Sequence, residues 1–113
     1  MPELIAIRRH LHSHPELSMQ EQATSAFIQS KLSEWGIPFT AGIAVHGIVG
    51  LIEGKNPASR TIALRADMDA LPIVELNEVD YCSVNPGVMH ACGHDVHMTS
   101  LLGASKMLNE LKS

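Results

Sequence analysis

The segment from Val88 to His97, V-M-H-A-C-G-H-D-V-H, constrains this chain more than any other stretch. Its candidate donor residues are His90, Cys92, His94, Asp95 and His97. Imidazole nitrogen, thiolate sulfur and carboxylate oxygen are the donor types that hold zinc and similar divalent ions. Donors this close together, next to the start of an apolar helical pattern, predict a metal site.

Cys92 and His94 are the strongest ligand candidates, because only Gly93 separates them. Glycine lets the backbone turn tightly enough for both side chains to face one ion. A helix beginning at Asp95 or Val96 would present its positive end there, which favours the metal-binding thiolate. We interpret His90 and His97 as supporting or helix-capping residues, with ligand roles as the open alternative.

A second acidic cluster, R-A-D-M-D at 65–69, follows the apolar run T-I-A-L-R-A at 61–66, which predicts a buried strand. In open α/β sheets, functional groups gather beyond the carboxyl ends of the strands. Asp67 and Asp69 would share one face, because side chains in a strand alternate. They can bind a cation, orient a ligand histidine or pair with Arg65; a solvated loop with a local ion pair is the alternative.

The remaining pattern predicts an α/β fold, a sheet covered by helices, in a chain of 113 residues that suits one domain. We expect a helix from Pro2 that ends before Pro15, and a second that follows an S-x-x-E capping box at 18–21 and runs to Trp35. Strands are expected over 39–43, 47–53 and 61–66. A last helix should run to Lys112, and the residues expected to form its apolar face are Leu101, Ala104, Leu108 and Leu111.

The composition excludes some classes of partner and suggests a cellular setting. The net charge is −4 and no Lys/Arg run occurs, so we expect no nucleic-acid partner. No apolar run approaches the roughly 20 residues that span a bilayer, so we expect no membrane partner. The chain has two cysteines and no leader pattern at its start, which suggests a reduced, cytoplasmic setting. Cys82 is read as a plain loop or core residue and His46 as a turn residue.

Seven histidines are many for this length, and three of them, His10, His12 and His14, lie near the end of the first predicted helix. An imidazole suits a helix C-terminus, where it interacts with the dipole and the last carbonyls. A role near the metal site is the alternative.

Three runs together resemble one family: R-R-H-L-H-S-H-P-E-L-S, I-A-L-R-A-D-M-D-A-L-P-I and G-V-M-H-A-C-G-H-D-V-H-M-T-S-L-L-G-A. They resemble the N-terminal part of the hippurate hydrolase group. These are metal-dependent N-acyl-amino-acid amidohydrolases related to aminoacylases and metallo-carboxypeptidases. The resemblance implies that residues 1–113 are the N-terminal part of an aminopeptidase-like α/β catalytic domain with a mainly parallel sheet.

The resemblance also implies a site with two divalent ions, zinc or manganese, with cobalt or nickel as alternatives. Cys92 and His94 fall on the family's metal ligands and Asp69 on its active-site aspartate, while Asp67 and Asp95 would support them. The implied substrate is a small N-acyl amino acid, and we expect a homo-oligomer. The family's Glu-Glu pair, whose first glutamate is the general base, and its later histidines have no counterpart here.

Two interpretations of a different class stay open. In the first, the chain is one piece of an amidohydrolase whose activity needs the missing residues. In the second, it is a non-catalytic α/β module that binds a metal or a partner, or an inactive fragment that self-associates. A thiol oxidoreductase is disfavoured, because Cys82 and Cys92 do not form a C-x-x-C motif.

Overall fold

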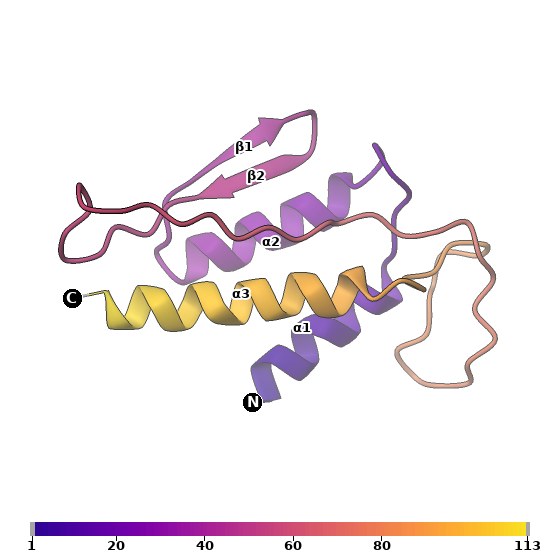
Figure 1. The fold of residues 1–113 in the computed structure, drawn as a ribbon. Helices are drawn as coiled ribbons and strands as arrows, with labels where there is room; N and C mark the ends of the chain where they lie inside the picture. Colours follow the sequence, from indigo (N-terminus) through magenta and orange to yellow (C-terminus); the bar gives the residue numbers. More distant parts are fainter. Residues whose placement is uncertain (1, 113) are drawn as a thin grey trace.

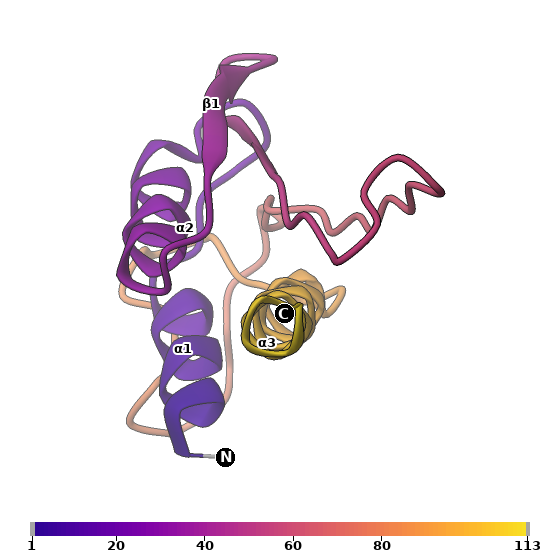
Figure 2. The same cartoon turned by 90° about the vertical axis from the view of Figure 1, so that its left-hand side faces the viewer.

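A computed structural model describes residues 2–112 (Figure 1). Its elements in order are α1 (Pro2–Ser13), α2 (Gln22–Glu34), β1 (Phe39–Ile43), β2 (Gly47–Gly50) and α3 (His94–Leu111). Helix α3 packs against α1, while α2 packs against the β1–β2 hairpin. Viewed along α3, the hairpin and α1 lie on opposite sides of α2 (Figure 2). None of the helices described is long and apolar enough to cross a bilayer.

The first helix confirms the sequence prediction. Pro2 opens it, where its missing N–H costs no hydrogen bond, and the helix ends at Ser13, before Pro15. Ile7 and Leu11 are each only 2% exposed and bury the apolar face of the helix. That face joins a core shared by all three helices. The core residues are Ile7, Leu11, Ile28, Leu32, Ile37, Met98 and Leu102.

The predicted capping box at 18–21 is wrong. Helix α2 begins four residues after Ser18, and no side chain of its N-cap residue makes a capping hydrogen bond. The carboxylate of Glu16 takes this role instead, accepting hydrogen bonds from the backbone N–H of Ala23 at 3.1 Å and Thr24 at 2.6 Å. The free amides of the first turn are therefore satisfied by a residue outside the local motif.

The hairpin confirms two predicted strands, although β2 ends at Gly50 rather than at 53. The strands pair antiparallel with an irregularity between Ala41 and Ile43, and His46 lies in the connecting turn as expected. In the described residues the only sheet is this hairpin, so the mainly parallel sheet is not formed there. A single parallel bridge joins Leu17 and Ala70.

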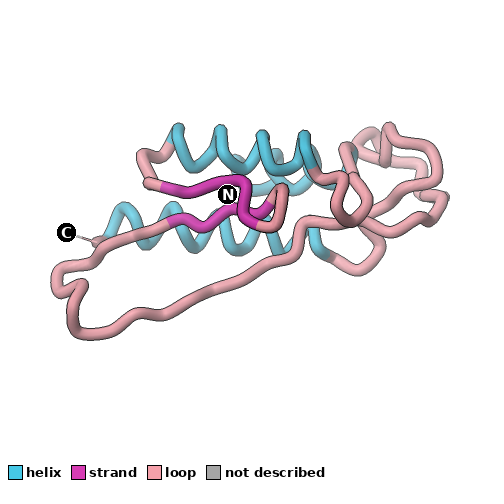
Figure 3. Tube along the Cα trace, turned by 90° about the horizontal axis from the view of Figure 1, so that it is seen from above, coloured by secondary structure: helices cyan, strands magenta, loops and turns pink. Residues whose placement is uncertain are grey.

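The strand predicted over 61–66 is not formed. This segment runs extended along the molecule without a strand beside it (Figure 3). A strand needs a neighbour to receive its N–H and C=O groups, and residues 2–112 place none there. Ile62 and Leu64 are therefore left 76% and 59% exposed.

Helix α3 was predicted in place but with the wrong buried face. Of the expected face, Leu101 and Ala104 are half-buried, while Leu108 is 50% exposed and Leu111 74% exposed. The buried residues are instead Asp95, Met98, Thr99, Leu102 and Gly103. Gly103 allows a close approach to α1, because a Cβ there would lie 2.8 Å from Cδ1 of Leu4. The buried stripe of α3 therefore starts at an aspartate, which an apolar pattern does not reveal.

Candidate metal centre

Two backbone anchors bring the two predicted clusters together. The Ala70 N–H donates to the carbonyl of Glu16 at 2.8 Å. Leu71 and Met89 exchange two backbone hydrogen bonds, each 2.9 Å long. These bonds hold the end of the R-A-D-M-D segment beside the chain that leads into α3.

His94 lies against both aspartates of that segment. Its Nδ1 is 2.8 Å from the backbone oxygen of Asp69 and 3.1 Å from Oδ1 of the same residue. Its Nε2 is 3.8 Å from Oδ2 of Asp67, a carboxylate that also accepts a hydrogen bond from Arg65 at 2.8 Å. Nδ1 faces oxygen acceptors on Asp69, so with a metal bound this nitrogen would carry the ring proton and Nε2 would offer its lone pair. Metal-binding histidines commonly show this arrangement.

Gly93 makes the turn into α3 at a φ of 87°, in the left-handed region that favours glycine. The His97 N–H donates to the Gly93 carbonyl at 2.9 Å and starts the helical hydrogen-bond pattern. Cys92 lies exposed at this turn. The structure thus places His94, Asp67 and Asp69 side by side and leaves the Cys92 thiol in solvent.

The donor atoms suit a divalent cation, but residues 2–112 do not supply a complete set of ligands. Among residues 2–112, no three His, Cys, Asp or Glu side chains converge on one point. The fit is therefore to a partial site: a histidine with a free nitrogen, its orienting aspartate and a nearby thiol. His97 is exposed, with its ring centroid 6.0 Å from that of His94.

His90 is buried beside this centre, with 4% of its surface exposed. Burial lowers its pKa, and the nearby Asp95 carboxylate opposes this effect only in part. Neither ring nitrogen has a hydrogen-bond partner within residues 2–112. A neutral imidazole that buried is normally paired, so His90 holds unused hydrogen-bonding capacity next to the site.

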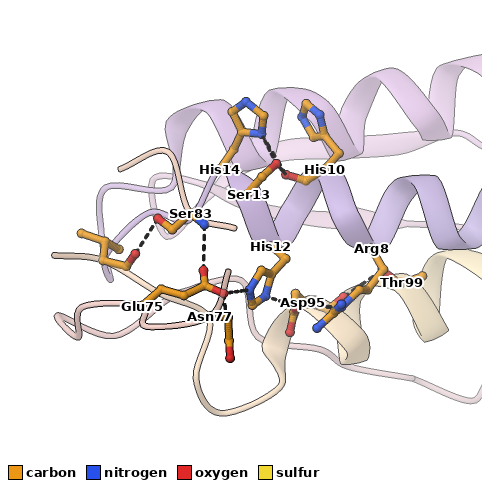
Figure 4. A network of polar contacts seen from close by, with 11 residues as sticks. Arg8, His10, His12, Ser13, His14, Glu75, Asn77, Ser83, Asp95 and Thr99 are labelled. Carbon is orange, nitrogen blue, oxygen red and sulfur yellow. Dashed lines mark hydrogen bonds and ion pairs between the residues drawn. The ribbon is translucent and has the colours of Figure 1, made fainter. Parts of the chain in front are cut away.

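Asp95, 1% exposed, is the other buried polar residue of this turn. Its Oδ2 accepts hydrogen bonds from Arg8 Nε at 3.0 Å and from His12 Nδ1 at 2.8 Å (Figure 4). The other ring nitrogen of His12, Nε2, lies 2.9 Å from Oε2 of Glu75. A chain of charged groups therefore joins α1, the segment after Leu71 and the first turn of α3.

Glu75 is firmly ionised in this network. Burial on its own would raise its pKa, but hydrogen bonds from His12, Asn77 and the Ser83 backbone outweigh this and lower the pKa to about 2. The Ser83 N–H donates at 2.7 Å and Asn77 Nδ2 at 3.0 Å. The side chain of Glu75 is only 4% exposed, so these partners replace water around the carboxylate.

From the sequence alone, we interpret His12 as a residue at a helix end and predict no role for Glu75. The one available signal was a lone carboxylate inside the otherwise apolar run I-V-E-L. His12 lies 83 positions from Asp95 and 63 from Glu75, so no spacing rule connects the three residues.

Residues 63–113 match the model of Peptidase family M20/M25/M40. The crystal structure of the Bacillus subtilis YXEP protein, described as a dinuclear metal binding peptidase from the M20 family, superimposes with a TM-score of 0.91 and 40% identity over 99% of this chain. This chain belongs to the M20 peptidase family. A putative aminohydrolase from methicillin-resistant Staphylococcus aureus has a TM-score of 0.92, also at 40% identity.

Relatives of the M20 chain carry hydrolase names. A probable hydrolase of Synechocystis is 48% identical over 98% of this chain, and an N-acyl-L-amino acid amidohydrolase of Geobacillus stearothermophilus is 46% identical over 97%. An N-acetyl-L-cysteine deacetylase of Bacillus subtilis is 49% identical over 96%. The chain spans 28%, 30% and 26% of these relatives and 32% of the YXEP chain. The family resemblance and the α/β fold class, as part of an M20 catalytic domain, are therefore confirmed for a chain that covers about a third or less of each of these relatives.

Proposed function

We propose that this M20 chain is part of a metal-dependent hydrolase that cleaves the amide bond of N-acyl amino acids, and that it supplies part of the metal site. The observation that supports this most directly is the position of His94. Its Nδ1 is held by Asp69, and its Nε2 lies toward Asp67. The names of the amidohydrolase and deacetylase relatives support the substrate class.

Each residue has a definite role in this proposal. Cys92 and His94 would bind a divalent ion, zinc or manganese, with cobalt or nickel as alternatives, and a complete site would hold two such ions. Asp69 fixes the tautomer and the orientation of His94. The bound metal would polarise the amide carbonyl and lower the pKa of a coordinated water.

The proposal extends to the setting of the whole protein. We expect residues 1–113 to be the N-terminal part of the catalytic domain. The protein should act in the cytoplasm on small N-acyl amino acids and assemble as a homo-oligomer. Size-exclusion chromatography with light scattering on the complete protein would test the assembly.

Metal content and hydrolysis should be measured together on the complete protein. The variants Cys92→Ser and His94→Asn remove the two proposed ligands, and Cys82→Ser and His46→Asn, in a loop and in the hairpin turn, are matched controls. We expect each ligand variant to lose bound zinc or manganese and most cleavage of N-acetyl amino acids. Asp69→Asn should weaken metal binding or activity by roughly 10- to 100-fold, as is typical for a residue that orients a ligand.

The controls should keep both properties near the wild-type level. Full metal content and activity in Cys92→Ser and His94→Asn would overturn the ligand assignment. A wild-type protein that binds no zinc or manganese and cleaves no N-acyl amino acid would instead support the non-catalytic module.

A further inference from the structure

His12 lies between two carboxylates that it bonds at the same time. Its Nδ1 faces Asp95 and its Nε2 faces Glu75, at 2.8 Å and 2.9 Å, and the imidazole side chain is 5% exposed (Figure 4). Both ring nitrogens are engaged at once, so the His12 side chain bridges the two carboxylates.

Other charged groups complete the surroundings of this ring. Arg8 shares Oδ2 of Asp95 with His12, and Tyr81 meets the imidazole edge-on at a centroid distance of 5.9 Å. Arg8 and His12 thus both contact the Asp95 carboxylate, and two carboxylates contact the ring. A buried network of this kind specifies one geometry when all its members are satisfied.

The network is tied to the candidate metal centre by sequence. Asp95 follows His94 directly and lies in the first turn of α3. Its side chain reaches into the core toward α1, while the adjacent histidine side chain faces Asp69. Fixing the Asp95 carboxylate therefore limits how that turn can rotate or shift.

We propose that His12 is a positioning residue for the metal site. Its doubly hydrogen-bonded imidazole fixes Asp95, and through Asp95 the helix turn that presents His94. This inference rests on the proposed metal-dependent function, and it gives His12 no contact with metal or substrate. A side chain that donates to only one of the two carboxylates would not replace it.

The chain contains a suitable control. Lys106 and Glu3 also link α3 to α1 by an ion pair, but their pair lies at the other end of α1, away from His94. The variant Lys106→Met breaks this contact and leaves the His12 network intact. A loss of zinc affinity in His12→Gln but not in Lys106→Met would then result from lost positioning of His94, rather than from weaker packing of α3 against α1 in general.

Metal affinity of the complete protein gives the first readout, measured by competition with a chromophoric chelator for zinc and by the visible spectrum of bound cobalt. At a temperature where both variants are folded, His12→Gln should bind zinc roughly 10- to 100-fold more weakly and show a changed cobalt spectrum. Lys106→Met should stay within about twofold of wild type. If His12→Gln is folded and matches Lys106→Met in both measurements, the proposal is wrong.

Glu75→Gln serves if His12→Gln does not fold. It keeps the bond from His12 to Asp95 and removes one charged partner, so a smaller loss of zinc affinity is expected; none at all would overturn the proposal. Nitrogen NMR of the His12 ring in the wild-type protein gives an independent readout, in which both ring nitrogens should be engaged in hydrogen bonds. A ring nitrogen that makes no hydrogen bond would refute the two-contact geometry.

These outcomes are separable from a failure of the proposed function. If the wild-type protein binds no metal, the proposed function is wrong, and so is the proposal that His12 positions a metal ligand. The NMR result would then still show whether both nitrogens of the His12 ring are hydrogen-bonded. Wild-type protein that binds zinc normally, with unchanged affinity in folded His12→Gln, removes only the role of His12.

Discussion

Replacing Glu75 by glutamine should make the free energy of unfolding less dependent on pH in the acid range. The Glu75 carboxylate is buried and accepts hydrogen bonds from His12, Asn77 and Ser83, and its pKa is about 2 against a usual 4.5. A lowered carboxylate pKa means that the folded state binds its proton more weakly than the unfolded state. The resulting stabilisation is complete above about pH 4.5 and is lost as the pH falls toward 2.

The magnitude follows from the size of the shift. The lowering of the Glu75 pKa from 4.5 to about 2 corresponds to at most about 3 to 4 kcal/mol at neutral pH, since each pKa unit is worth about 1.4 kcal/mol. Between pH 7 and pH 3 the folded state should lose about 1 to 2 kcal/mol of this contribution. Glutamine cannot ionise, so the variant should start less stable at pH 7 and lose correspondingly less on acidification.

The measurement is urea unfolding of wild type, Glu75→Gln and Glu78→Gln at pH 7 and at pH 3. Glu78 lies exposed on the same segment, so its variant controls for loss of one charge. We expect the stability gap between wild type and Glu75→Gln to shrink by about 1 to 2 kcal/mol at the lower pH. An equal gap at both pH values would refute the assignment of Glu75 as a buried, ionised partner of His12.

Three further predictions concern the framework around the site, and each is measured by chemical denaturation. Glu16→Ala should cost about 1 kcal/mol by removing the α2 cap, whereas Ser18→Ala should cost almost nothing; equal costs would contradict the observed cap. Gly103→Leu should cost about 1 to 3 kcal/mol by overpacking against Leu4, and Leu4→Ala in the same protein should recover part of it; no recovery would place the clash elsewhere. Gly93→Ala should cost about 1 to 2 kcal/mol, because its φ of 87° lies in the left-handed region, and an unchanged stability would mean that the turn relaxes.

Local sequence patterns predicted the features that depend on neighbouring residues. The first helix follows from its proline start and apolar spacing, and the hairpin follows from two short strands around a turn. The metal-type donors of the segment before α3 were visible as residue types, and Gly93 as the residue that turns the chain. Whether Cys92 and His94 bind one ion stays a prediction.

Features that depend on distant partners were not predictable in the same way. The apolar spacing of α3 favoured a face through Leu108, but Asp95 directs a different face inward because its carboxylate is satisfied from α1. The segment 61–66 has a strand composition, yet strand pairing depends on a neighbour that the segment cannot specify. The role of Glu75 depends on a histidine 63 positions away.

The paired backbone bonds between Leu71 and Met89 close the base of the loop that carries Glu75. A third backbone hydrogen bond, from the Val84 N–H to the Ser13 carbonyl at 2.8 Å, also holds this loop. Between Leu71 and Val84, residues 76–80 are all exposed and contribute nothing to the core. Changes of length, fluorescent labels or grafted peptides should therefore be tolerated at 78–80, whereas equal changes next to Leu71, Val84 or Met89 would disturb the candidate metal centre.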